Sequence, residues 1–224
     1  SIAWGDYDND GDLDIALSGG RGFVKVYRNN GDETFTDVEA TGFAGVASSS
    51  IAWGDYDNDG NLDLAVGGSV GSSSVTIIYK NNGDNIFTDI QAELTGISKG
   101  SLAWGDYNND GNLDLAICGG LNTASGWSNI TKIYKNNGDE IFTDIKAELK
   151  AVQVGSLAWG DYDNDGDLDL AVCGDGHFSP GPQGYITNVY KNNGDDTFTD
   201  INAGLQPVSM GGLAWGDYDN DGDL

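Results

Sequence analysis

The sequence predicts an all-β protein, a β-propeller built from four-stranded antiparallel blades, and three observations support this prediction. An acidic segment led by tryptophan, WGDYDNDGDLD in its first copy, returns four more times at intervals of about fifty residues. This period, without helix signals, is typical of propellers and other repeat arrays. Each copy also carries four short stretches with the composition or alternation of β-strands. We therefore expect one domain over residues 1–224, with complete blades at 1–49, 50–100, 101–155 and 156–211 and a partial blade at 212–224.

The strands of one copy are expected in a fixed order, which the first copy illustrates. Residues 1–7 (SIAWGDY) alternate bulky and very small side chains, which indicates the first strand. After an acidic loop, residues 13–20 (LDIALSGG), 23–31 (FVKVYRNNG) and 34–38 (TFTDV) indicate the second, third and fourth strands. The short, polar fourth strands favour the outer edges of blades over a straight solenoid, which is the alternative architecture.

An Asn-Gly pair separates the third and fourth strands of every complete copy. Asn and Gly accept the positive φ of a type I′ turn, so we expect a tight hairpin at each pair. The pairs are Asn30-Gly31, Asn82-Gly83, Asn137-Gly138 and Asn193-Gly194.

The acidic loop between the first and second strands predicts a calcium site. In the first copy, carboxylates stand at alternate positions (Asp6, Asp8, Asp10), Gly11 permits a sharp turn, and Asp14 closes the loop. This spacing suits Ca²⁺, which takes six to eight oxygens, whereas Mg²⁺ demands rigid octahedral geometry. The expected side-chain ligands are Asp6, Asp8, Asp10 and Asp14; Asp55, Asp57, Asp59 and Asp63; Asp106, Asn108, Asp110 and Asp114; and Asp161, Asp163, Asp165 and Asp169. The expected backbone carbonyl donors are those of Asp12, Asn61, Asn112 and Asp167, and a partial fifth site offers Asp217, Asp219 and Asp221.

Four complete Ca²⁺ sites and one partial site are therefore expected. A solvated acidic turn is the alternative, and the repetition of the pattern disfavours it. Because all the ligands come from the protein, we expect the calcium to be structural, and we expect no catalytic residue. The third site carries Asn108 where the others carry Asp, which predicts a less charged and weaker site.

The pattern D-x-[DN]-x-D-G-x-x-D, complete in four copies, resembles the FG-GAP or VCBS repeat family. That family comprises calcium-loop β-propellers found in integrin α-subunits and in many secreted bacterial proteins. The resemblance implies a secreted or cell-surface protein that serves adhesion, and it implies calcium in the loops.

Composition limits the classes of partner. The chain has 10 basic and 36 acidic residues, a formal charge of -26, which argues against nucleic acid and anionic membranes as partners. No apolar run is long enough for a membrane span, so no membrane insertion is expected. The sequence has no signal peptide or starting Met, so we expect a mature or partial chain.

The two cysteines, Cys118 and Cys173, occupy equivalent positions in successive copies. Packed sheets lie about 10 Å apart, beyond the Cα separation of about 7 Å that a disulfide tolerates. We expect two free, buried thiols.

The loop between the second and third strands is the part of the repeat that varies. Four side chains in its longer versions have no counterparts elsewhere: Trp127, His177, Phe178 and Tyr185. In a four-stranded meander these loops open at the end opposite the acidic loops, so we expect the four residues on one rim. Binding residues concentrate in such loops, and these aromatics are candidates for stacking on sugars or packing on a protein. The alternative is that each closes its own loop over the sheet.

The leading hypothesis is a non-enzymatic extracellular calcium-binding propeller for adhesion or for protein or glycan recognition. One rival is a polysaccharide lyase or other carbohydrate-active enzyme, which would need a cluster of basic or phenolic side chains that this sequence scarcely supplies. Another rival is a structural subunit of a filament or surface layer. The partial fifth copy predicts either a larger propeller of about seven blades or self-association through the incomplete blade.

Overall fold

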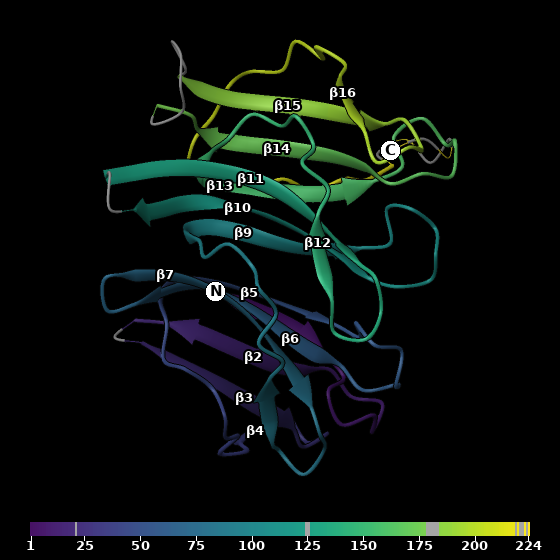
Figure 1. Cartoon of the computed structure of the whole chain (residues 1–224). Coiled ribbons are helices and arrows are strands. Elements are labelled where there is room, and N and C mark those ends of the chain that lie inside the picture. The colour runs from purple at the N-terminus through teal and green to yellow at the C-terminus, as the bar shows by residue number, and fades with distance from the viewer. Residues whose placement is uncertain (21, 124–125, 178–183, 218, 220–221, 223) are drawn as a thin grey trace.

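The protein is all-β in a computed structural model that describes residues 1–224 apart from 21, 124–125, 178–183, 218, 220–221 and 223. The described strands form four antiparallel sheets of four strands, each made from one repeat and ordered as in the chain (Figure 1). The first two sheets are β1 (Ile2–Gly5), β2 (Asp14–Gly19), β3 (Phe23–Asn29) and β4 (Phe35–Asp37), and β5 (Ala47–Gly54), β6 (Asp63–Val70), β7 (Ser73–Asn81) and β8 (Phe87–Asp89). The last two are β9 (Ser98–Gly105), β10 (Asp114–Thr123), β11 (Gly126–Asn136) and β12 (Phe142–Asp144), and β13 (Gln153–Gly160), β14 (Asp169–Asp175), β15 (Tyr185–Asn192) and β16 (Phe198–Asp200).

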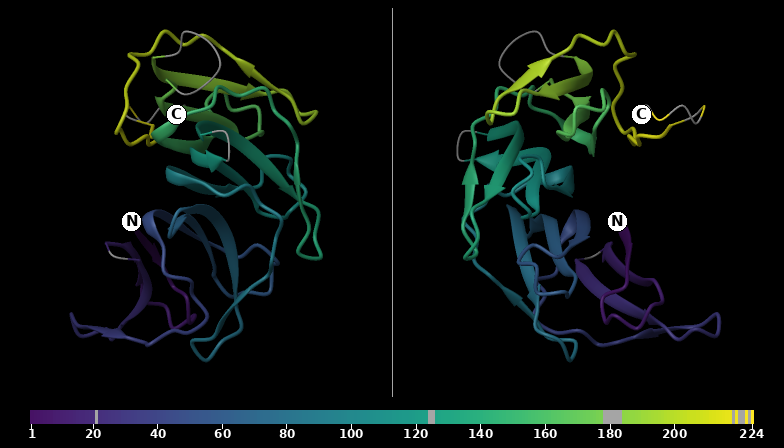
Figure 2. Two further views of the ribbon diagram at one scale, coloured as in Figure 1. Left: turned by 60° about the vertical axis from the view of Figure 1, so that its left-hand side comes forward. Right: turned by 90° about the vertical axis from the view of Figure 1, so that its right-hand side faces the viewer.

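The four sheets lie side by side and follow one another along an arc, with both termini on the same side (Figure 2). Buried apolar clusters join neighbouring sheets. One cluster, for example, combines Ala16 and Val26 of the first sheet with Leu64, Val66 and Tyr79 of the second. Each sheet therefore buries one face against the next, as stacked repeats do. No described segment forms a helix long and apolar enough to cross a membrane.

The tryptophan of each repeat after the first packs on a glycine of the preceding sheet. A Cβ on Gly105 would lie only 2.7 Å from Trp159 Cδ1, so glycine is required for this close approach. Trp159 Nε1 donates to Ala103 O at 3.2 Å, and its ring stacks on Tyr107. The equivalent glycine and tryptophan pairs are Gly5 with Trp53, Gly54 with Trp104, and Gly160 with Trp215.

A buried asparagine at the end of the third strand of the second, third and fourth sheets also links each sheet to the preceding one. Asn136 Nδ2 donates to Tyr56 O of the preceding sheet at 2.8 Å and to Leu113 O of its own sheet at 3.2 Å. Its counterparts repeat this link, Asn81 with Tyr7 O at 3.0 Å and Asn192 with Tyr107 O at 2.7 Å.

The outer face of the first sheet lacks such cover. Asn29 donates within its own sheet, to Leu13 O. Ile2 and Trp4 are 55% and 56% exposed, whereas the equivalent Trp53 is half-buried. The residues that seal the other inter-sheet contacts are therefore at the surface here.

The turns between third and fourth strands differ from the expected type I′ hairpins. In the first repeat Asn29 pairs with Phe35, so five residues form the loop. Gly31 (71°) and Glu33 (67°) have positive φ, whereas Asn30 does not. The backbone N–H of Asn30 donates to Thr34 O at 3.0 Å. The hairpins are confirmed but the predicted turn type is wrong, because side-chain and backbone bonds stabilise a wider loop.

The partial copy at 212–224 was expected to add a fifth first strand, and its described residues form none. Leu213 N donates to Ser156 Oγ at 3.3 Å and Trp215 Nε1 to Ala158 O at 3.1 Å, so the segment docks on the fourth sheet through side chains. A strand needs a ladder of backbone partners, and no described second strand supplies one here.

Cys118 and Cys173 are free and buried, as expected. Burial raises the pKa of the Cys118 thiol to about 12. The buried thiol is therefore inert at neutral pH.

Candidate metal centres and ligand-binding face

The acidic loops share one backbone geometry, which the first aspartate fixes. Asp6 accepts hydrogen bonds from Asp10 N at 3.1 Å and Gly11 N at 3.0 Å. The chain turns through left-handed conformations at Asn9 (φ 58°) and Gly11 (φ 96°). The same two bonds recur at Asp55, Asp106 and Asp161. Each loop is thus held in a shape that gathers carboxylates.

The last aspartate of each complete loop opens the second strand and is fully buried. Asp63 accepts from Tyr56 N at 3.2 Å and from Asn81 N at 2.8 Å. Burial raises its pKa from the usual 3.8 to about 7, and that of Asp114 likewise. A buried carboxylate beside other carboxylates needs a proton or a cation to offset its desolvation. The counterparts Asp14 and Asp169 also have raised pKa values, again because of burial.

Three of the loops bring three carboxylates together. In each group the oxygen atoms lie within 4.8 Å of one another, the groups being Asp6, Asp8 and Asp10; Asp55, Asp57 and Asp63; and Asp161, Asp163 and Asp169. An all-oxygen donor set of this charge fits a hard cation of the size of Ca²⁺. Asp14, Asp59 and Asp165, predicted as ligands, lie outside these groups.

The third loop does not form such a group within the described residues. Asn108, which replaces Asp, accepts from Asp110 N at 2.9 Å, and its buried Nδ2 has no hydrogen-bond partner among the described residues. In the fifth loop Asp217 accepts a hydrogen bond from Gly222 N at 2.9 Å. The predicted ligand Asp219 is among the residues that the structure describes. The predicted ligand Asp221 lies outside the described residues.

A lysine beside the acidic loop was not predicted. Lys80 Nζ contacts Asp57 and lies 3.1 Å from Asp59 Oδ2, and its pKa is raised chiefly by the hydrogen bond to Asp57. Lys191 pairs with Asp163 and Asp165 in the same way. These ammonium groups offset part of the repulsion in the loops. A bound cation would compete with them for these carboxylates.

The asparagine in the middle of each loop is a second residue that the sequence argument missed. Asn9 Nδ2 donates to Gly60 O of the next loop at 2.9 Å, and Asn58 Nδ2 donates to Gly111 O at 2.9 Å. Asn109 and Asn164 repeat the link. The signal was available, because this position is Asn in all five copies.

The predicted rim residues divide into two groups. His177 Nδ1 contacts Asp175, and the His177 ring lies 5.5 Å from the Tyr185 ring, edge on. Trp127 belongs to the extended β10–β11 hairpin, where it pairs with Asn122, and not to a loop as expected. No ring contact joins Trp127 to the other two in the part of the chain that the structure describes. Phe178 lies outside the described residues.

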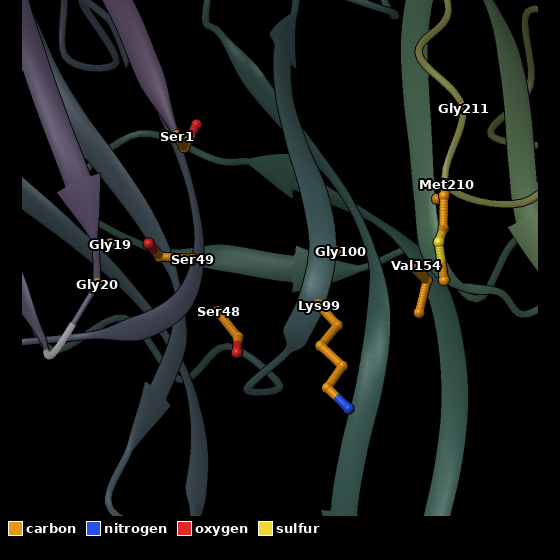
Figure 3. Close-up of a pocket in the computed structure, with 11 residues that line it drawn as sticks. Ser1, Gly19, Gly20, Ser48, Ser49, Lys99, Gly100, Val154, Met210 and Gly211 are labelled. Atoms are coloured by element: carbon orange, nitrogen blue, oxygen red, sulfur yellow. The ribbon is translucent and has the colours of Figure 1, made fainter.

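A cavity of about 540 Å³ lies at this same end of the sheets. Four of its lining residues are equivalent positions in successive repeats, five residues before each tryptophan, and all have left-handed backbone: Ser48, Lys99, Val154 and Met210, with φ of 50°, 51°, 48° and 56°. Their side chains point in one direction (Figure 3). The sequence does not single out this set, because the four positions precede the predicted first strands and carry a different residue in each repeat.

Replacing one loop ligand should weaken one site. We expect Asp57→Asn to lower the calcium affinity of the second loop by about tenfold, because it removes a charged oxygen and copies the natural Asn108. Calorimetric calcium titration measures the effect. Asp89→Asn, which changes an exposed carboxylate on β8, should leave the titration unchanged. A titration of Asp57→Asn identical to that of the parent would contradict the assignment.

Comparison with known proteins bears on the family and the fold. Among solved structures, a lectin from Agrocybe aegerita, described as recognising non-reducing terminal N-acetylglucosamine specifically, is similar, with a TM-score of 0.51 and 24% identity. The similar region covers 89% of this chain and 50% of the lectin chain, so this chain spans about half the lectin's length. At this identity the likeness concerns the fold alone. Comparison with curated proteins gave no match. The family model of the FG-GAP-like repeat matches residues 1–66, which confirms over those residues the FG-GAP family that the acidic motifs indicate.

Proposed function

We propose that this protein is an extracellular, non-enzymatic calcium-binding β-propeller that recognises glycans or proteins. The observation that carries the proposal is a division between the two ends of the sheets. Repeated acidic loops occupy one end, and side chains that differ from repeat to repeat occupy the other. Repetition serves the scaffold, whereas unrepeated residues on a rigid scaffold serve recognition.

The four sheets would be blades, and calcium would hold each acidic loop. When bound, the ion supplies positive charge to carboxylates that otherwise repel one another. The protein groups Asp6, Asp55, Asp106 and Asp161 orient the loops through their backbone hydrogen bonds. Because protein oxygens surround the ion position, the calcium would be structural. Secretion or cell-surface exposure follows from the need for abundant calcium, since extracellular modules bind it with Kd of about 10⁻⁴–10⁻³ M.

Glycan recognition is favoured by the structural likeness to a lectin and by the exposed rings of Trp127 and Tyr185, which are 49% and 55% exposed. A glycan array probed with the labelled protein in calcium, and repeated with EDTA, tests the proposal. We expect calcium-dependent binding to a defined set of glycans. An array without signal, together with no protein captured from cell-surface extracts, would contradict it.

A polysaccharide lyase remains the enzymatic alternative. The described residues provide few free basic side chains for such an enzyme. The single histidine, His177, is bound to Asp175, and six lysines are ion-paired: Lys25, Lys80, Lys132, Lys135, Lys150 and Lys191. We propose that the protein has no lyase activity. Formation of unsaturated uronate products on incubation with polyuronates, detected by their ultraviolet absorbance, would show the opposite.

We also propose that the exposed face of the first sheet is covered by another sheet of the same kind. Ile2, Trp4 and Asn29 have counterparts in the other sheets that are covered by the preceding sheet. The covering sheet would come from a longer chain, giving a ring of about seven blades, or from a second copy, which would be self-association of a filament-like or ring-like kind.

The 224-residue chain alone separates the two sources. We expect it to associate head to tail, with the first sheet of one copy replacing the Leu213–Trp215 segment that occupies the matching position on the fourth sheet, and we expect Trp4→Asp to prevent this. Analytical ultracentrifugation measures both. Trp127→Asp, an equally drastic change of an exposed tryptophan outside this face, is the control. If the unsubstituted 224-residue chain sediments as a 23.5 kDa monomer at all concentrations, self-association is excluded, and the covering sheet would come from a longer chain.

A further inference from the structure

The cavity beside Lys99 combines a repeated backbone geometry with unrepeated side chains. Ser48, Lys99 and Val154 lie in β-bulges, where the register of the first strand shifts against the second. Left-handed backbone is strained for these residues, above all for the β-branched Val154. Such strain is retained where a side chain must be aimed, and here it aims four different side chains to one side (Figure 3).

The residues that follow the bulges explain why the geometry is fixed. A Cβ on Gly100 would lie 1.8 Å from Cys118 O, and one on Gly155 would lie 2.0 Å from Cys173 O. At these glycines the backbone of the first strand therefore lies in close contact with the second strand. The residues before them, Lys99 and Val154, point away from it. The fold itself therefore holds Lys99 in this outward position.

Lys99 is unlike most other lysines of the chain. Among the described residues, no carboxylate lies within 4.0 Å of Lys99 Nζ, whereas six other lysines are ion-paired. Its ammonium group lies 5.5 Å from the centroid of the Trp127 ring, a cation–π contact. The Trp127 ring also lies close to Gly120, where a Cβ would be 3.5 Å from Trp127 Cζ3 and 3.0 Å from Gln153 Oε1. An exposed cation and an exposed aromatic ring thus converge at the edge of the cavity.

The acidic loops lie too far from this cation to cancel its charge. Lys99 stands near the start of β9, and the acidic loop begins beyond Gly105 at its other end, a distance of about 20 Å at the usual rise per residue. The Debye length at physiological ionic strength is about 8 Å, so the field of the loops is largely screened at Lys99. The end of the sheets that carries the cavity can therefore accept a single anionic group, although the chain as a whole repels polyanions.

We propose that Lys99 and Trp127 bind a sugar that carries one carboxylate, such as a terminal uronic acid residue. This inference rests on the proposed glycan recognition. The ammonium group would pair with the carboxylate, and the Trp127 ring would pack on the apolar face of the sugar. The hydroxyl group of the exposed Ser48 is available to a sugar hydroxyl, and about 540 Å³ is ample for one residue.

Calorimetric titration of the whole chain in millimolar calcium tests the assignment with two matched sugars, methyl glucuronide and methyl glucoside, which differ only at the carboxylate. We expect methyl glucuronide to bind and methyl glucoside to bind at least about tenfold more weakly. Lys99→Gln should weaken glucuronide binding by about 10- to 100-fold, the usual loss for a charge-assisted hydrogen bond. Trp127→Ala should weaken the binding of both sugars. Sodium acetate, which has the carboxylate without the ring, should bind more weakly than the glucuronide.

Lys146→Gln is the matched control. Lys146 is also exposed, has left-handed backbone (φ 59°) and lies outside the cavity. Its replacement removes the same charge and should change the affinity less than about twofold. The melting temperature in calcium confirms that each variant folds.

Each of four results would overturn the assignment. The two sugars could bind equally, or no glucuronide binding could be seen at about 10 mM. Lys99→Gln could bind the glucuronide as tightly as the unsubstituted protein, or Lys146→Gln could lose as much affinity as Lys99→Gln. These results leave the proposed function standing if the array shows binding to neutral glycans. A silent array together with a silent titration would overturn both.

Discussion

Removal of calcium should lower the melting temperature of this protein by about 10–20 °C. A ligand present at ten times its Kd stabilises the folded state by about 1.4 kcal/mol per site, so four loops contribute about 5–6 kcal/mol. That is comparable with the whole stability of many domains. For a chain of this size each kcal/mol corresponds to about 2–4 °C. Differential scanning calorimetry in millimolar calcium and after dialysis into calcium-free buffer measures the difference, with magnesium at the same concentration as the control.

The size of this effect should depend on pH. Burial raises the pKa of Asp63 and Asp114 to about 7, so in the calcium-free protein these groups favour folding when protonated. Their contribution is fully present below the usual pKa of 3.8 and is lost as the pH rises to about 7. Calcium needs the deprotonated form and acts in the opposite direction. The difference in melting temperature should therefore be larger at pH 8 than at pH 5, and the opposite order would contradict the account.

Asn136→Ala should destabilise the protein by about 3–5 kcal/mol, a fall of roughly 6–20 °C in melting temperature. The side chain is buried and serves three backbone groups: it donates to Tyr56 O and Leu113 O and accepts from Gly138 N. Its loss leaves these groups without partners at the contact between two sheets. The expected cost is therefore that of several unsatisfied buried polar groups.

The equivalent residue of the first sheet provides the control. Asn29 also accepts from the glycine two residues on and donates to Leu13 O, but its side chain makes no inter-sheet bond to any residue that the structure describes, and it is only half-buried. Asn29→Ala should cost about 1 kcal/mol or less. Equal losses in the two variants would mean that the asparagine supports its own turn and not the contact between sheets.

The scaffold can be predicted from the sequence because each repeat contains the same local sequence signals. Strand alternation, the acidic spacing and the glycine before the first aspartate are all short-range signals, and repetition removes chance matches. The free, buried state of Cys118 and Cys173 could be predicted because it depends only on their equivalent places in adjacent sheets.

The errors have different physical origins. The Asn30-Gly31 turn is wider than expected because Asn29 accepts from Gly31 N and fixes a five-residue loop, a choice that the dipeptide alone does not reveal. Trp127 lies in a hairpin because β10 and β11 extend each other by pairing, which is a property of two segments together. The left-handed position of Lys99 carries a different residue in each repeat, so no residue type marks it.

A crystal structure grown in millimolar calcium would test the central claim most directly. The account predicts one calcium ion in each of the four complete loops, coordinated at about 2.3–2.6 Å by carboxylates and one backbone carbonyl. Asp63 and Asp169 would be ligands, and Lys80 and Lys191 would have moved away from the carboxylates that the ions hold. Loops that remain without ions, with both lysines still bound to Asp57 and Asp163, would contradict it.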